Sequence, residues 1–254
     1  MCEFSIEFFR YVVDSIMMQN LRDAARETLG IKLSKRQAEA FSWYGEELQV
    51  WNERFNLTAI RSKEEIETKH FLDSLSCVLA RQFQPSGAMV DVGTGAGFPG
   101  LPLKIVFPQI QLTLLESIGK KVSFCRHVVK ELNLKEVTVE QSRAESRGRE
   151  TEYRESYDTA LARAVAATPV LVEYVLPLIK VGGCAILQKG ETGPAEAQSS
   201  ENAIHILGGK MDQIVKVELP GVAETRYLLV VRKVAATPDQ YPRRPGIPAK
   251  RPIE

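Results

Sequence analysis

The sequence has 254 residues, of which 44% are hydrophobic and 26% charged, and its formal net charge is +1 at pH 7. This length predicts one large core with a smaller appendage, and the near-neutral charge does not indicate nucleic-acid binding over the whole surface. No apolar run is long enough for a membrane span, and Glu3 stands where a signal peptide needs positive charge. We therefore expect no membrane association and no secretory signal.

The four cysteines and three histidines are widely spaced. Cys2, Cys77, Cys125 and Cys184 form no C-x-x-C pair, and the histidines give no metal-ligand spacing. We therefore expect neither disulfides nor a metal site. A reduced, cytoplasmic location fits this pattern.

The spacing of apolar residues predicts a helical N-terminal segment over residues 1–85. Two helix starts carry the capping-box pattern, Ser34 with Gln37 and Ser62 with Glu65. In such a box the serine oxygen accepts a backbone hydrogen bond, and the side chain three residues later returns a contact.

Residues 86–254 predict a second, α/β domain that ends in a basic tail. Repeated alternation of strands and helices implies a parallel sheet covered on both faces. The last two strands are separated by PGVAET, which is too short for a crossover helix, so they should pair antiparallel. Residues 143–155 hold four arginines and four glutamates and predict a solvated loop. The expected strands are MVDVG, QLTLLES, VTVEQS, YDTALAR, GGCAILQ, QIVKVEL and RYLLVVRK.

The stretch VDVGTGAGFPG, Val90 to Gly100, contains the letters G-x-G-x-x-G of a dinucleotide-binding loop. Asp91, however, is expected at the mouth of this loop, where a carboxylate repels a pyrophosphate and attracts an ammonium group. Pro99 and Pro102 each remove a backbone donor that a pyrophosphate would use.

Glu116 at the end of the second strand is suited to hydrogen-bond both hydroxyls of a ribose. A ribose joined to an amino acid without phosphate is the outline of S-adenosylmethionine. Together with the final hairpin, this predicts a class I S-adenosylmethionine-dependent methyltransferase fold, which is Rossmann-like. A nicotinamide or flavin enzyme, and a glycine turn without any ligand, are the alternatives.

Several stretches, in order along nearly the whole chain, resemble the RsmG (GidB) family of ribosomal RNA methyltransferases. The resemblance implies transfer of a methyl group from S-adenosylmethionine to N7 of one guanosine in a loop of 16S ribosomal RNA near the decoding centre. Two features differ from the usual family pattern, a long charged loop over residues 146–155 and Ala162 in place of a common serine. The stretches are WNERFNLTAI, KHFLDSL, VDVGTGAGFPGLPLKI, LLESIGKKVSFC, RAE (Arg143 to Glu145), RAVA (Arg163 to Ala166) and YPRRPGIPAK.

The resemblance also implies which residues line the cofactor site. Glu145 is expected beside the adenine and Phe98 beside the methionine end, with core packing as the alternative for Phe98. The full set of expected cofactor residues is Asp91, Gly93, Gly95, Gly97, Phe98, Glu116, Ala144, Glu145 and Arg163.

Arg163 is the residue that we expect beside the transfer point, as the catalytic residue. It can bind guanine O6, a phosphate or the cofactor carboxylate, and a structural pairing with Asp158 or Glu116 is the alternative. Guanine N7 carries a lone pair, so no general base is expected. For His70 a structural role is favoured over a catalytic one.

The substrate expected from the resemblance is 16S ribosomal RNA or the small ribosomal subunit. Separately, we expect the chain to act as a monomer. N7 lies in the deep groove of an RNA helix, so the target base must be unpaired or splayed out. Trp51 and Asn56 are expected to hold the helical segment on the sheet. The expected phosphate contacts are Lys120, Lys121, Arg243, Arg244 and Lys250. A methyltransferase acting on another RNA, a protein or a small molecule, and a non-catalytic ribosome-binding module, stay open.

Overall fold

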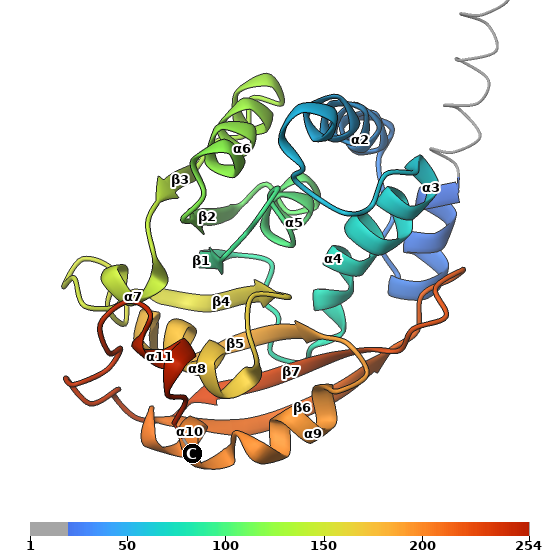
Figure 1. Cartoon of the computed structure of the whole chain (residues 1–254). Coiled ribbons are helices and arrows are strands. Elements are labelled where there is room, and N and C mark those ends of the chain that lie inside the picture. The colour runs from blue at the N-terminus through green and yellow to red at the C-terminus, as the bar shows by residue number, and fades with distance from the viewer. Residues whose placement is uncertain (1–19, 254) are drawn as a thin grey trace, which may run out of the picture.

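Seven strands form one mixed β-sheet in the computed structural model, which describes residues 20–253 (Figure 1). The strands are β1 (Gly87–Val92), β2 (Ile110–Glu116), β3 (Val137–Gln141), β4 (Tyr157–Arg163), β5 (Ile179–Lys189), β6 (Gly209–Val217) and β7 (Arg226–Lys233). They lie in the order β3-β2-β1-β4-β5-β7-β6. Pairing is parallel from β3 to β5, and β7 lies antiparallel between β5 and β6. The predicted sheet with its C-terminal hairpin is confirmed.

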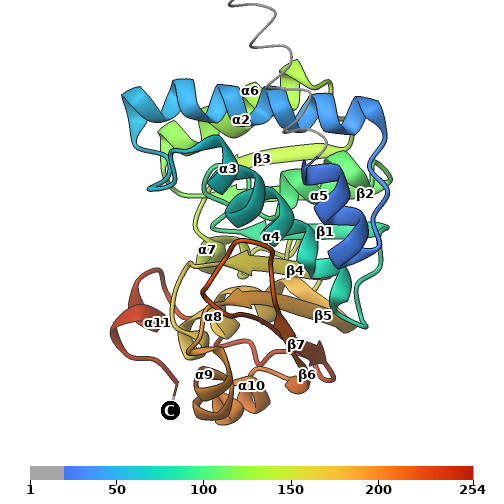
Figure 2. The same cartoon turned by 90° about the vertical axis from the view of Figure 1, so that its right-hand side faces the viewer.

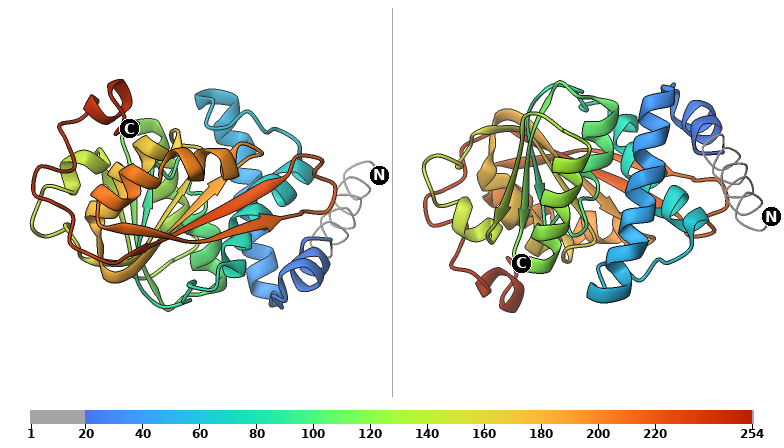
Figure 3. Two further views of the ribbon diagram at one scale, coloured as in Figure 1. Left: turned by 90° about the horizontal axis from the view of Figure 1, so that it is seen from below. Right: turned by 90° about the horizontal axis from the view of Figure 1, so that it is seen from above.

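Helices cover both faces of the sheet, and two hydrophobic clusters fill the space between (Figure 3). Successive strand residues point to opposite faces. Met89 and Leu161 therefore belong to one cluster, whereas Val90 and Ala160 belong to the other. The first cluster includes side chains of α2 (Lys35–Phe55), α5 (Gly100–Val106) and α6 (Gly119–Glu131); the second includes α8 (Thr168–Val175), α9 (Gly193–Ser199) and α10 (Glu201–Ile206).

The helical segment before β1 packs on the first face, where α2 lies over α5 and α6 (Figure 2). Trp51 of α2 contacts Phe124 of α6, with ring centroids 5.4 Å apart. Asn56 is exposed and ends α2 with a left-handed φ of 47°. The helices of this segment are residues 20–29, α2, α3 (Lys63–Glu65), a π-helix (Ile66–Leu72), α4 (Asp73–Leu75) and a 3-10 helix (Ser76–Leu79).

The two predicted capping boxes have different outcomes. At Ser34 both halves of the box form with Gln37. At Ser62 only the first half forms, since Ser62 Oγ accepts from the N–H of Glu65. The Glu65 carboxylate instead pairs with Lys69 at 3.0 Å.

The charged stretch after β3 is not the solvated loop that the sequence predicts. It includes α7 (Ala144–Arg147), and Arg149 and Arg154 donate hydrogen bonds to backbone carbonyls of residues 237–242. Glu155 accepts from the N–H of Thr237 at 2.7 Å. The prediction was wrong because irregular backbone also needs hydrogen-bond partners, and these arginines supply them.

No helix within residues 20–253 has the length and apolar composition of a membrane span. Glu3, on which the signal-peptide prediction depends, lies outside the described residues, as does Cys2. The remaining cysteines, Cys77, Cys125 and Cys184, are buried and carry no disulfide.

Candidate functional site

An open cleft of about 250 Å³ lies at the carboxyl ends of β1, β2 and β4. Open α/β sheets bind their ligands at this edge. The predicted residues that line the cleft are Gly93, Glu116, Ala144 and Glu145. The other lining residues are Val92, Leu115, Ser117, Ser142, Arg143, Val165, Ala166, Tyr174 and Ala249.

A larger cleft of about 330 Å³ lies between α2, α5 and the turn after α6. Its residues precede β2 and β3, so it lies at the amino edge of the sheet. None of the predicted site residues lines it. The smaller cleft is therefore the candidate site.

Glu116 is fixed in the wall of the candidate cleft by two backbone hydrogen bonds. Its Oε2 accepts from the N–H of Gly95 at 3.0 Å and its Oε1 from the N–H of Ile118 at 2.8 Å. The Ser117 hydroxyl is a second, longer donor to Oε1, at 3.5 Å, whereas Oε2 accepts from Gly95 alone and keeps a second lone pair. The side chain can therefore accept from ligand hydroxyl groups, such as those of a ribose, with Oε2 open to the first of them.

Asp91 lies beneath the glycine loop, and the expectation that its carboxylate stands at the loop mouth is wrong. The residue is fully buried, and its Oδ2 accepts from Thr94 Oγ1 at 2.6 Å and from the N–H of Gly100 at 2.8 Å. Because side chains alternate between the two faces of the sheet, Asp91 lies on the same face as Met89, which is the face that α5 covers. There it accepts from the two loop donors, Thr94 Oγ1 and the N–H of Gly100. Burial raises the pKa of Asp91 to about 6, although these hydrogen bonds act in the opposite direction.

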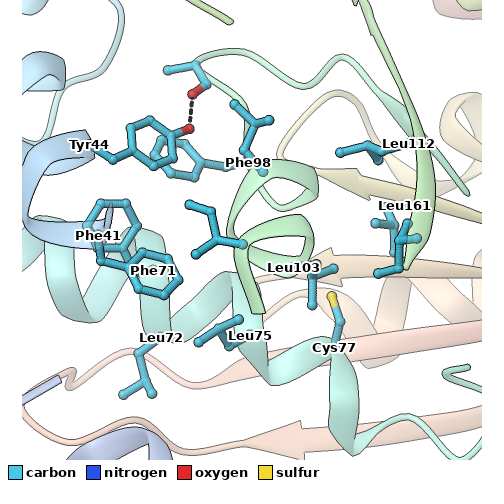
Figure 4. Close-up of a cluster of buried hydrophobic side chains, with 14 of the residues drawn as sticks. Phe41, Tyr44, Phe71, Leu72, Leu75, Cys77, Phe98, Leu103, Leu112 and Leu161 are labelled. Atoms are coloured by element: carbon cyan, nitrogen blue, oxygen red, sulfur yellow. Dashed lines mark hydrogen bonds between the residues drawn. The ribbon is translucent and has the colours of Figure 1, made fainter. Parts of the chain in front are cut away.

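The outer part of the glycine loop packs against α2 (Figure 4). Tyr44 is fully buried, donates its hydroxyl hydrogen to the carbonyl of Ala96, and stacks on Phe98 with ring centroids 5.4 Å apart. Gly97 has a φ of 98°, and a Cβ there would lie 2.5 Å from the Tyr44 oxygen. Phe98 is 5% exposed and belongs to this core instead of the cleft wall.

Arg163 points from the end of β4 into the helical segment, with only 13% of its side chain exposed. Its Nη1 pairs with Asp73 Oδ2 at 2.9 Å, and its guanidinium carbon lies 5.0 Å from the centre of the Phe98 ring. Asp73 was missed, although it stands within the KHFLDSL stretch. The arginine is thus held by residues that lie far from it in the sequence.

The alternative partners that the sequence suggested for Arg163 are engaged elsewhere. Asp158 pairs with Lys180 at 3.0 Å, and Glu116 holds the glycine loop. The carboxylate that pairs with Arg163 is therefore that of Asp73, which the sequence analysis did not suggest.

His70 is neutral and has both ring nitrogens occupied. Its Nδ1 lies 3.1 Å from Nη2 of Arg163, which can only donate, so Nδ1 accepts. Nε2 then carries the hydrogen and donates to Thr58 Oγ1 at 2.9 Å. Burial and the Arg163 charge lower the pKa of His70 to about 3. These contacts favour the structural role.

The predicted phosphate contacts divide into exposed and engaged side chains. Lys120, Arg244 and Lys250 are exposed, and Lys121 is half-buried. Arg243 instead binds the fully buried Glu173 through Nε and Nη2, at 2.9 and 2.6 Å. The contact that the structure gives the Arg243 side chain is therefore an ion pair within the fold.

The C-terminal segment contributes to the cleft, which the sequence did not predict. Ala249 of α11 (Ile247–Lys250) lines it, and the N–H of Gly246 donates to Glu145 Oε1 at 3.0 Å. The Gly- and Pro-rich composition predicts an irregular segment, but no local signal says where that segment docks.

The cleft suits the nucleoside part of S-adenosylmethionine. Glu116 offers acceptors for a diol, Ala144 leaves space beside it, and a Cβ at Gly95 would point into open space. Pro99 and Pro102 stand at the start of α5, so few free N–H groups face a phosphate there. The described residues contain no group of three or more His, Cys, Asp or Glu side chains arranged to hold a metal ion.

Comparison with solved structures supports the fold assignment. The chain is similar to TrmN from Thermus thermophilus, with a TM-score of 0.50 and 16% identity, covering 72% of this chain and 53% of that chain. It is also similar to the YcgJ protein from Bacillus subtilis, with a TM-score of 0.50 and 15% identity over 66% of this chain and 100% of that chain. The predicted class I methyltransferase fold is confirmed.

Sequence comparison identifies the family. The model of the GidB family, described as rRNA small subunit methyltransferase G, matches residues 37–225. A ribosomal RNA small subunit methyltransferase G from Alkaliphilus metalliredigens is 49% identical, covering 92% of this chain and 98% of the relative. Another from Roseiflexus castenholzii is 51% identical, covering 88% and 95%. This chain belongs to the GidB family of rRNA small subunit methyltransferases, as the resemblance implied.

Proposed function

We propose that this chain transfers the methyl group of S-adenosylmethionine to N7 of one guanosine in a loop of 16S ribosomal RNA near the decoding centre. Family membership gives the reaction class, which is S-adenosylmethionine-dependent methylation of ribosomal RNA. The observation that carries the proposal is the cleft lined by Glu116 and Glu145 beside the glycine loop. The resemblance to RsmG supplies the base, the atom and the RNA.

The cofactor would lie with its ribose on Glu116 and its adenine beside Ala144 and Glu145. Asp91 would act from below, because it holds Thr94 and Gly100 and so keeps the loop in shape. When bound, the cofactor supplies an electrophilic methyl group on a sulfonium. The residues that would face its methionine end are those of the glycine loop, Gly93, Gly95 and Gly97.

The side chains near the site suit a reaction that removes no proton before the methyl transfer. His70 is neutral with both nitrogens bonded, so it is not available as a base. Burial raises the pKa of Cys77 and Cys125, so neither provides a thiolate nucleophile. Guanine N7 requires neither group, and the protein would accelerate the reaction mainly by holding N7 close to the methyl group.

Arg163 is proposed as the residue beside the transfer point. Its guanidinium is held by Asp73 and His70, so it can present a fixed positive charge. Guanine O6, an RNA phosphate and the cofactor carboxylate are the acceptors that it can bind. It would not contact N7, because that atom must face the methyl group.

The test is to map N7-methylguanosine in small-subunit RNA from cells with and without this gene. We expect one modified position to disappear with the gene and to return with the wild-type copy. If the same N7-methylguanosine positions are found with and without the gene, the proposed function is contradicted. Incubating the purified chain with labelled donor, ribosomal RNA and ribosomal protein separates the other substrates, since label only in protein contradicts RNA methylation.

We further propose that the chain acts as a monomer in the cytoplasm, with residues 86–254 as the methyltransferase domain behind the helical segment of residues 1–85. Light scattering of the purified protein tests the monomer, for which we expect a mass near 28.4 kDa. A mass of twice that value contradicts it.

A further inference from the structure

The C-terminal segment folds back to the carboxyl edge of the sheet, where it passes α7 and α8 (Figure 1). Buried residues alternate with exposed ones along it. Thr237, Pro242 and Pro248 are buried, whereas Arg244 and Ala249 are exposed. This pattern indicates a segment that is anchored at intervals and open to solvent between the anchors.

Arg154 is the first anchor of this segment. Its Nη1 donates to the carbonyls of Tyr241 at 2.7 Å and Gly148 at 3.1 Å, and its Nη2 to those of Thr237 at 2.5 Å and Pro238 at 3.3 Å. A guanidinium has five donors in a rigid fork, so one side chain can hold several carbonyls in fixed positions. Lysine cannot reproduce this arrangement.

Glu173 of α8 is the second anchor. It is fully buried, and Arg243 of the C-terminal segment donates to it from its backbone N–H at 2.7 Å and from its side chain. A buried carboxylate without a partner is strongly destabilising. The docked segment therefore satisfies a charge that the rest of the fold places in the interior.

Glu145 connects the C-terminal segment to the cleft. Its Oε1 accepts from the N–H of Gly246 at 3.0 Å, and Glu145 itself lines the cleft. Ala249, three residues after Gly246, lines the same cleft. One carboxylate thus contacts both the segment and the space that a ligand would fill.

We propose that residues 237–250 form a strap that acts as one wall of the S-adenosylmethionine cleft, with Arg154 and Glu173 as the positioning residues that hold it. The inference rests on the proposed cofactor. If the strap forms the wall, docking of the strap and binding of the cofactor stabilise each other to the same extent, because linked equilibria are reciprocal.

The first test measures binding of S-adenosylhomocysteine to the full chain by calorimetry. We expect Arg154→Met to weaken binding about tenfold, which corresponds to ~1.4 kcal/mol. With saturating RNA, the KM for the methyl donor should rise while kcat at saturating donor changes little. The matched control is Arg126→Met, because Arg126 also donates to a backbone carbonyl, that of Val139, but lies on α6 away from the strap.

A second pair of variants tests the strap without changing either anchor, Arg154 or Glu173. Ala249→Trp places bulk on an exposed strap position that lines the cleft and should weaken binding, whereas Arg251→Trp, also exposed but not lining the cleft, should not. Limited proteolysis supplies an independent measurement. The ligand should protect residues 237–250 in the wild type and protect them less in Arg154→Met.

The results separate the strap from the proposed function. A wild type that does not bind S-adenosylhomocysteine would contradict the cofactor assignment itself. A wild type that binds, with Arg154→Met and Ala249→Trp binding equally well, would overturn the strap alone. If Arg154→Met does not fold, the comparison of Ala249→Trp with Arg251→Trp decides.

Discussion

Arg163 carries a positive charge that is largely removed from water and is compensated by groups from a distant part of the chain. Asp73 supplies the opposite charge, and His70 supplies a neutral acceptor. Because the side chains of Asp73 and Arg163 are only 5% and 13% exposed, their attraction is weakly screened. The pair therefore couples the helical segment to the end of β4.

The first prediction concerns this ion pair. Asp73→Asn and Arg163→Met should each lower the free energy of unfolding by about 3 kcal/mol, because each leaves one charge without its partner. The double variant should lose less than the sum of the two, by at least ~1 kcal/mol. Urea denaturation of the four proteins measures this coupling, and additive losses would contradict it.

The second prediction concerns the pH dependence that Asp91 imposes. Burial raises the pKa of Asp91 from its ordinary value of 3.8 to about 6. A raised folded-state pKa means that the contribution of this group to stability is fully present below pH 3.8 and is lost as the pH rises through 6. Asparagine does not titrate.

The stability of Asp91→Asn relative to wild type should therefore improve as the pH rises from about 4 to about 7. Denaturant unfolding at each pH, without ligand, gives the difference between the two proteins. A difference that stays constant would show that Asp91 keeps its ordinary pKa beneath the loop, and a change in the opposite direction would show that folding lowers this pKa; either result contradicts the prediction.

At the scale of elements, the start of α2 and the end of α5 are held by one side chain. Gln37 Oε1 accepts from the N–H of Ser34 at 2.9 Å, and its Nε2 donates to the carbonyls of Ile105 at 3.1 Å and Val106 at 3.0 Å. These carbonyls belong to the last turn of α5, where carbonyls have no partners within their own helix.

The third prediction follows from this double contact. Ser34→Ala should lower the free energy of unfolding by about 1 kcal/mol, which is typical for a lost N-cap. Gln37→Ala should cost more, because it also leaves the two α5 carbonyls without their donor. Thermal or urea unfolding ranks the two variants, and the reverse order would contradict the argument.

The strands were predictable because their signals are local. Apolar runs bounded by turn residues predicted all seven, and the short PGVAET connection predicted the hairpin. The π-helix was not predictable, since over seven residues its apolar spacing differs little from that of an α-helix. The charged stretch after β3 was misjudged because composition does not reveal a partner almost a hundred residues away, as Arg149 has in Pro242.

The candidate site, like the fold, could be predicted only as far as local sequence signals reach. Glu116 ends β2 and Glu145 follows β3, and the carboxyl ends of these strands meet at one edge, so the sequence predicted both residues at one site. The surroundings of Arg163 depend on how the helical segment docks, which is set by packing across the core. The spacing of residues in the sequence does not reveal how the helical segment docks. Asp73 and Tyr44 both belong to that segment, and both were missed for this reason.

At the scale of the whole molecule, a net charge of +1 conceals an uneven distribution. Exposed cations stand near the candidate cleft, on the first turn of α6 and on the strap. An anionic RNA that presents a base to the cleft would release counterions from these side chains, and its affinity would fall as salt rises. Three of these exposed cations, Lys120, Arg244 and Lys250, are predicted phosphate contacts; Arg143, which lines the cleft, is also exposed.

The fourth prediction replaces these three side chains together by glutamine. The slope of log affinity against log salt should become shallower by about 2, because each contact to single-stranded RNA contributes roughly 0.7. Filter binding of small-subunit RNA over a salt series measures the slope. Arg243 is left unchanged, because its removal would leave Glu173 buried without a partner.

The matched control makes the same change of charge at the opposite edge of the sheet. Lys35, Arg36 and Lys135 are exposed near the larger cleft, so their replacement by glutamine alters the net charge equally. If the RNA binds where the candidate site requires, this control should keep nearly the wild-type slope, because charges beyond a Debye length of about 10 Å are largely screened. Equal losses from both triple variants would mean that the RNA is attracted by total charge, and a loss from the control alone would place it at the amino edge.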